Sequence, residues 1–125
     1  MKFIIAAGPV IIENSKVLLV KHGQDDFWKF PGGRVEDFSE LDLQEHAQRE
    51  AKEELGIDTE IVRPLKTLMV KQDDTLVVLV HYLARRVGEI TPGPDIREWR
   101  WIDLNRLPTD LAPNIFPIIQ ECGEI

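Results

Sequence analysis

The sequence predicts a single α/β domain in which a mixed β-sheet carries helices on its faces. Three observations support this prediction. The chain has 125 residues, which is the size of one ordinary domain. Hydrophobic residues make up 43% of it and charged residues 30%, as in folded globular proteins. Short β-rich runs surround one segment of clear helical periodicity. No repeat or linker interrupts the chain, so we expect residues 1–125 to form one domain.

The chain opens with two β-rich runs, residues 3–12 and 17–20, around a polar four-residue turn. This pattern is typical of a β-hairpin. A basic residue followed by an apolar run also resembles a signal peptide. Because the pattern continues through the turn into a second β-rich run, we favour the hairpin.

Three further strands are predicted, over residues 60–70, 75–85 and 96–102. Pro64 interrupts the first and indicates an edge position or a bulge, because proline cannot donate to the ladder. The second contains an apolar run at residues 76–80, which predicts a central strand covered on both faces. A loop rich in glycine and proline precedes the third.

The clearest helix is predicted from residue 41 or 42 to residue 55. Asp42 and Glu45 have the spacing of a capping box at its start. Gly56 stands where a left-handed C-terminal cap is expected. A second helix is predicted over residues 114–121. Together the strands and helices predict helices packed against a sheet.

Composition limits the partners and the compartment. Fifteen Lys and Arg residues against 22 Asp and Glu residues give a net charge of −7, so we expect no duplex nucleic acid as partner. No run reaches the roughly 18 apolar residues of a membrane span, so we expect no membrane partner. The single cysteine, Cys122, excludes an internal disulfide and favours a reducing, cytoplasmic location. A homodimer is left open.

Three carboxylates gather near the end of the first predicted helix. Glu50, Glu53 and Glu54 fall within about a third of its circumference. They repel one another and oppose the helix dipole. One interpretation is an ordinary solvated face, and the other is a site for a hard divalent cation, which would relieve both conflicts. Arg49 could hold Glu53 through an i,i+4 contact.

A glycine turn precedes this helix. Residues 30–36, Phe-Pro-Gly-Gly-Arg-Val-Glu, place two glycines after an aromatic strand. Glycine lets the backbone approach a ligand closely, and the carbonyl of Gly33 could complete an oxygen shell around a cation. A Gly-Gly pair is equally compatible with a plain turn.

Taken together, these residues resemble the signature of the MutT-like Nudix hydrolases, G-x5-E-x7-R-E-U-x-E-E-x-G-U with U apolar. The matching residues are Gly33, Arg49, Glu50, Ala51, Glu53, Glu54, Gly56 and Ile57. The opening hairpin, the glycine turn and residues 100–108 also match, so the resemblance covers nearly the whole chain. It implies an α/β/α sandwich with a mixed sheet.

The first half of the signature departs from the pattern. The segment from Gly33 to Arg49 is two residues longer than the signature allows. Counting forward from Gly33 places Ser39 at the position of the first glutamate, whereas counting back from Arg49 places Leu41 there. Glu40 lies nearest to both slots and could serve if the loop bulges.

The resemblance implies hydrolysis of a nucleoside diphosphate linked to another moiety, with Mg²⁺ as cofactor and Mn²⁺ as a substitute. The metal ligands it implies are Gly33, Glu50, Glu53 and Glu54, and the catalytic residues are Arg49, Glu50, Glu53 and Asp95. The general base would be Glu50 or a downstream acid. Asp95 stands six residues before Trp101, and Glu98 is its rival.

We expect Trp28, Lys29 and Arg34, which flank the glycine turn, to contact a small-molecule nucleotide. Trp28 could stack on a base or pack in the core. The proline and tyrosine tags of ADP-ribose and dinucleoside-polyphosphate enzymes are absent, which by elimination favours a nucleoside triphosphate pyrophosphohydrolase. The alternative is a catalytically silent nucleotide-sensing or protein-binding domain, because the two added residues could disturb the site geometry.

Overall fold

The computed structural model describes residues 1–36, 39 and 42–123 of the chain. Its elements are β1 (Lys2–Glu13), β2 (Lys16–His22), β3 (Gly33–Arg34), α1 (Leu43–Leu55), β4 (Asp58–Pro64), β5 (Leu68–Gln72), β6 (Thr75–Val87), β7 (Ile96–Asp103) and α2 (Ile115–Glu121). The predicted hairpin is present as β1 and β2, joined by a tight turn. The last predicted strand and both helices are present as well.

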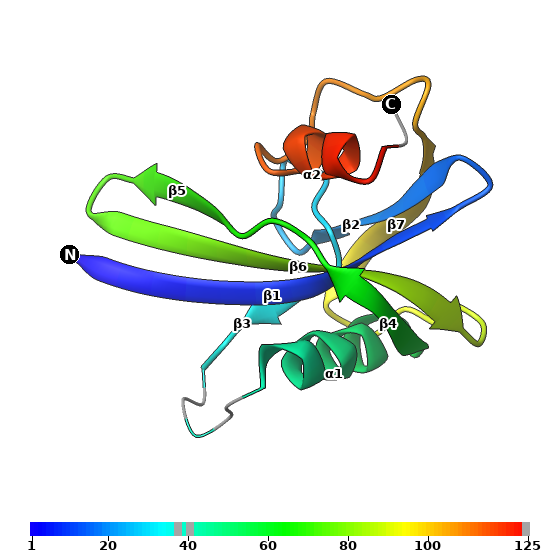
Figure 1. Cartoon of the computed structure of the whole chain (residues 1–125), viewed down its shortest axis with the longest axis horizontal. Helices are drawn as coiled ribbons and strands as arrows, with labels where there is room; N and C mark the ends of the chain where they lie inside the picture. Colours follow the sequence, from blue (N-terminus) through cyan, green and yellow to red (C-terminus); the bar gives the residue numbers. More distant parts are fainter. Residues whose placement is uncertain (37–38, 40–41, 124–125) are drawn as a thin grey trace.

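Within the described residues, one seven-stranded sheet runs in the order β4-β6-β1-β2-β7, with β3 beside β1 and β5 beside β6. β1 and β6 pair in parallel from Lys2–Thr75 to Ile11–Ala84, and the remaining pairs are antiparallel. The sheet is therefore mixed, as predicted. The two helices lie on opposite faces of it (Figure 1).

Alternation along the strands creates two cores. Val10 and Leu19 face α2, whereas their neighbours Ile11 and Leu18 face α1, because successive strand residues point to opposite faces. All four side chains are fully buried, and such burial stabilises a fold by about 1.5–3 kcal/mol for each side chain. These two cores make the α/β/α sandwich that the family resemblance implies.

Local signals set the ends of α1 as predicted. The Asp42 side chain accepts hydrogen bonds from the backbone N–H groups of Gln44 and Glu45. Gly56 has the left-handed conformation, with φ of 68°, and its N–H donates to the Lys52 carbonyl. Neither α1 nor α2, the helices of the described residues, has the length and apolar character needed to cross a bilayer.

Two strand predictions are wrong in detail. The expected strand over residues 60–70 is divided into β4 and β5, because Pro64 ends the ladder and the chain then shifts along β6. β6 is central, as predicted, but its residues 76–80 are only half-buried. Leu79 and neighbouring β6 side chains line a cavity instead of meeting a helix.

Candidate functional site

The glycine turn is pressed against β1. A Cβ atom on Gly8 would lie 1.9 Å from the Pro31 carbonyl oxygen, and one on Gly32 would lie 2.6 Å from the Ala7 carbonyl oxygen. Gly32 also has φ of 144°, which L side chains rarely adopt. After this contact the chain forms β3, in which Gly33 pairs with Ala7. The turn is therefore fixed by backbone packing that only glycine permits.

Glu50 of α1 faces this turn. A Cβ on Gly33 would lie 2.7 Å from Glu50 Oε2, so the carboxylate lies directly against the Gly33 backbone. Two residues that the sequence marks as metal ligands, 17 positions apart, are thus neighbours in space.

Glu54, one turn further along α1, is 9% exposed. Its Oε1 accepts the backbone N–H of Gly32 at 2.8 Å. Its Oε2 contacts Nε2 of His22, at the end of β2. These partners offset the cost of burying the carboxylate. His22 was not predicted as a site residue, and no motif in the sequence marks it.

The charges of the two carboxylates interact. Burial, and then the negative charge of Glu54, raise the pKa of Glu50. Glu53 adds to this rise, whereas Arg49 opposes it. A raised carboxyl pKa means that the ionised form lacks sufficient stabilisation. A cation beside Glu50 would supply it.

For His22, the interaction with a neighbouring charge outweighs burial in setting the pKa. Its hydrogen bond with Glu54 raises its pKa, and this effect exceeds the lowering by burial. Asp25 holds the other ring nitrogen, with 3.3 Å between Oδ2 and Nδ1. The Glu54 carboxylate therefore favours the protonated form of His22.

The outer part of the signature lies at the surface. The predicted i,i+4 contact is present, with 3.6 Å between Arg49 Nε and Glu53 Oε1, and both side chains are at least half exposed. Glu53 does not line the cavity that Glu50 and Glu54 line. Glu40 lies outside the described residues.

A cavity of about 900 Å³ opens beside the two carboxylates. Lys29 and Arg34, two of the predicted substrate contacts, line it. Trp28 does not, because it is 4% exposed within the core on the α2 side, the packing alternative considered above. Phe27, which is 52% exposed, lines the cavity in its place.

The far wall of this cavity holds a hydrogen-bonded pair. Asn114 Nδ2 donates to His81 Nε2 at 2.9 Å, so the His81 hydrogen lies on Nδ1, which donates to the Lys66 carbonyl at 2.8 Å. Burial lowers the pKa of His81. The ring is therefore neutral near pH 7, and this wall carries no charge from it.

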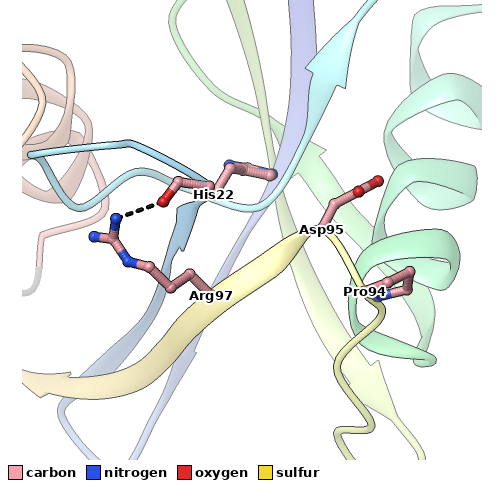
Figure 2. Close-up of a pocket in the computed structure, with 5 residues that line it drawn as sticks. His22, Pro94, Asp95 and Arg97 are labelled. Carbon is pink, nitrogen blue, oxygen red and sulfur yellow. Dashed lines mark hydrogen bonds between the residues drawn. The ribbon is translucent and has the colours of Figure 1, made fainter.

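Asp95 lines a second cavity of about 610 Å³ that shares His22 with the first. In Figure 2 its carboxylate and the guanidinium of Arg97 point away from each other, and Arg97 binds the Gly23 carbonyl. Glu98 lines neither cavity and lies on β7, 3.8 Å from Arg97. The structure thus separates the two candidate bases.

The oxygen donors fit a hard divalent cation. Among residues 1–36, 39 and 42–123, no group of three histidine, cysteine or acidic side chains is arranged to hold a metal ion. Mg²⁺, however, usually binds through one or two carboxylates and completes its shell with water and substrate phosphates. Glu50, Glu54 and the Gly33 carbonyl supply that kind of partial set.

Comparisons with known proteins agree with this geometry. The family model of the NUDIX domain matches residues 2–122. The chain is 30% identical over 110 residues to an ADP-ribose pyrophosphatase of Methanocaldococcus jannaschii. The aligned region covers 83% of this chain and 64% of that relative. The structure resembles a MutT NUDIX hydrolase from Burkholderia pseudomallei, with a TM-score of 0.84, 25% identity and coverage of 97% and 98% of the two chains.

It also resembles an ADP-ribose pyrophosphatase from Streptococcus suis, with a TM-score of 0.76, 26% identity and coverage of 97% of this chain and 90% of that one. The match to the family model covers both cores, the glycine turn and all of α1. The chain therefore belongs to the NUDIX domain family.

Proposed function

We propose that the protein is a metal-dependent pyrophosphohydrolase that cleaves a nucleoside diphosphate linked to another moiety. One observation carries the proposal: Glu50, Glu54 and the Gly33 backbone meet at one end of a cavity of about 900 Å³. Cavities of this size hold nucleotide-sized ligands. The names of the NUDIX relatives support the same reaction class.

Glu50, Glu54 and the Gly33 carbonyl would hold a divalent cation, Mg²⁺ in the first instance with Mn²⁺ as a substitute. When bound, such a cation neutralises phosphate oxygens and acidifies water. Its charge would also lower the raised pKa of Glu50, because it favours the ionised carboxylate.

Two basic side chains would bind the phosphates from the cavity wall. Arg34 follows the glycine turn directly, and its planar guanidinium suits bidentate contact with phosphate oxygens. Lys29 donates to Asp25 at 3.1 Å in an exposed pair. Exposed pairs of this kind contribute little, so a phosphate can exchange with Asp25.

Proton transfer would fall to an acidic residue near the attacked phosphorus. Glu50 is one candidate, because its carboxylate lies against the Gly33 backbone and lines the cavity. Asp95 is the alternative, because its cavity adjoins the carboxylate pair through His22. Positioning and charge neutralisation would supply most of the remaining rate enhancement.

Two substrate classes compete. The missing proline and tyrosine tags favour a nucleoside triphosphate, whereas two of the relatives are ADP-ribose pyrophosphatases. A panel of nucleoside triphosphates, ADP-ribose, sugar nucleotides and dinucleoside polyphosphates with Mg²⁺ distinguishes them by the rate of product release. Binding without turnover across the panel would favour the nucleotide-sensing alternative.

Substitution of Glu53 tests the metal assignment at its most exposed residue. Since the ion pair with Arg49 is exposed and weak, the Glu53 carboxylate can turn toward a substrate-bound cation. We expect Glu53→Gln to lower turnover roughly 10²-fold or more, as for loss of a transition-state charge partner. Glu45→Gln, in the first turn of the same helix, is the matched control. Turnover within a few-fold of the parent would show that Glu53 is not a ligand.

A further inference from the structure

His46 is a buried side chain of α1 that lies outside the proposed metal ligands and phosphate contacts. It is 1% exposed, and its ring points at the glycine turn. Nε2 lies 2.9 Å from the Gly33 carbonyl oxygen, and Nδ1 lies 3.0 Å from Nη2 of Arg49. The ring thus joins a signature arginine to a carbonyl in the turn.

The chemistry of the three groups fixes the direction of these bonds. A guanidinium nitrogen only donates, so Arg49 donates and His46 Nδ1 accepts. The ring hydrogen then lies on Nε2, which donates to the Gly33 carbonyl. The result is a directed chain from Arg49 through His46 to Gly33.

The same ring nitrogen lies beside a second oxygen donor. Nε2 of His46 is 3.8 Å from Oε1 of Glu50, which itself lies against the Gly33 backbone. His46 therefore holds one proposed ligand and adjoins another.

We propose that His46, oriented by Arg49, is a positioning residue that sets the Gly33 carbonyl and Glu50 at the separation a divalent cation requires. This inference rests on the proposed function. Side chains that orient metal ligands without touching the metal typically contribute 10- to 100-fold to metal affinity or activity. A purely structural hydrogen bond would contribute to folding stability and leave cation affinity unchanged.

Two substitutions separate these roles. His46→Leu removes the N–H donor, whereas His46→Gln keeps an N–H at a similar distance from the backbone and serves as the rescue variant. Gln48→Ala is the matched control, because Gln48 donates to the Thr59 carbonyl at 2.8 Å and ties α1 to β4 instead of to the turn. Each variant is titrated with Mn²⁺ in the absence of substrate, with free Mn²⁺ measured by electron paramagnetic resonance and Tm by calorimetry.

We expect His46→Leu to weaken Mn²⁺ binding about tenfold or more. His46→Gln should restore most of the Mn²⁺ affinity. Gln48→Ala should lower Tm and leave the Mn²⁺ affinity unchanged. Arg49→Lys, at a half-exposed position, should weaken binding to a smaller extent because the planar donor is lost.

A folded His46→Leu protein with parental Mn²⁺ affinity overturns the inference and leaves the proposed function intact. If His46→Leu does not fold, parental Mn²⁺ affinity in Arg49→Lys overturns the inference. The inference also fails if Gln48→Ala weakens Mn²⁺ binding and His46→Gln binds Mn²⁺ no better than Gln48→Ala does. A parent protein that binds no Mn²⁺ overturns the proposed function and this inference together.

Discussion

The backbone N–H of Gly32 donates to Oε1 of Glu54 at 2.8 Å, which joins the glycine turn to the last turn of α1. The other Glu54 oxygen contacts His22. Both Glu54 oxygens therefore have hydrogen-bonding partners within the protein, whereas burial and like charges raise the pKa of its neighbour Glu50. A cation would therefore affect the two carboxylates differently. It would displace His22 from Glu54, whereas it would stabilise the ionised form of Glu50.

The contact between His22 and Glu54 predicts a pH dependence of metal-free stability. The pKa of His22 is raised in the folded protein, chiefly by Glu54, so the protonated ring stabilises the fold. This stabilisation is complete below the unfolded pKa of about 6.5 and is lost as pH rises through the folded pKa. Urea unfolding in EDTA should show a free energy of unfolding that falls over this window, and a His22→Asn variant should lack the fall.

The same pH window distinguishes the titration of His22 from that of the buried His81. Burial lowers the pKa of His81, so its contribution changes only below about 6.5, where the unfolded-state ring also titrates. The raised pKa of Glu50 affects stability from the unfolded value of about 4.5 upward, and its contribution is present in both the parent and His22→Asn. Parallel curves for parent and His22→Asn above pH 6.5 would contradict the prediction.

Glu50→Gln should make the metal-free protein more stable and the metal response smaller. Because the pKa of Glu50 is raised, its ionised form destabilises the fold, and this penalty grows as pH rises through the folded pKa. The neutral amide removes it. Thermal unfolding at pH 7.5 should give a higher Tm than the parent in EDTA and a smaller rise with Mg²⁺, and turnover should fall by roughly 10²-fold.

Glu45→Gln, at an exposed position in the first turn of α1, is the control for a general effect of charge removal. If Glu50→Gln lowers Tm in EDTA while Glu45→Gln does not, the Glu50 carboxylate has a stabilising partner, and its proposed role as an unneutralised ligand is wrong.

Local signals explain which parts of this fold the sequence predicts. Asp42 and Gly56 act on backbone groups within four residues, so both ends of α1 follow from sequence. The contact between His22 and Glu54 joins residues 32 positions apart and depends on the packing of β2 against α1. No local pattern encodes it. The division of β4 from β5 is intermediate, because Pro64 marks the break but not the shift along β6.

Gly8 is a second residue whose importance only the packing reveals. Its sequence neighbours predict an ordinary strand, yet a Cβ there would lie 1.9 Å from the Pro31 carbonyl oxygen and 2.8 Å from Gly32 Cα. Gly8→Ala must therefore displace the glycine turn. We expect a loss of about 1–3 kcal/mol in the free energy of unfolding, as for other overpacked positions, together with weaker Mn²⁺ binding.

Gly123→Asn is the control for this substitution. Among the residues that the structure describes, a Cβ at Gly123 would meet nothing within 4 Å, and asparagine tolerates its φ of 74°. Urea unfolding and Mn²⁺ titration of both variants check the prediction. An unchanged Mn²⁺ affinity in a destabilised Gly8→Ala protein would show that the turn can move without disturbing the ligands.

The position of Asp95, in the loop just before β7, depends on α1 as well as on β7. The N–H of Gly93 donates to the Glu54 carbonyl at 2.8 Å, which anchors the loop before β7 to the end of α1. This anchor places Asp95 in the cavity that shares His22 with the carboxylate pair, whereas Glu98 points to neither cavity.

If Asp95 is the general base, Asp95→Asn should lower kcat by about 10²- to 10⁴-fold, the usual contribution of proton transfer, with Mn²⁺ affinity unchanged. Glu98→Gln, three positions along the same segment, should keep parental kcat because its carboxylate lies outside both cavities. Steady-state kinetics with the best substrate of the panel measures both variants. A large loss in Glu98→Gln would exchange the two roles. Parental kcat in both variants would leave Glu50, which lines the cavity of about 900 Å³, as the base.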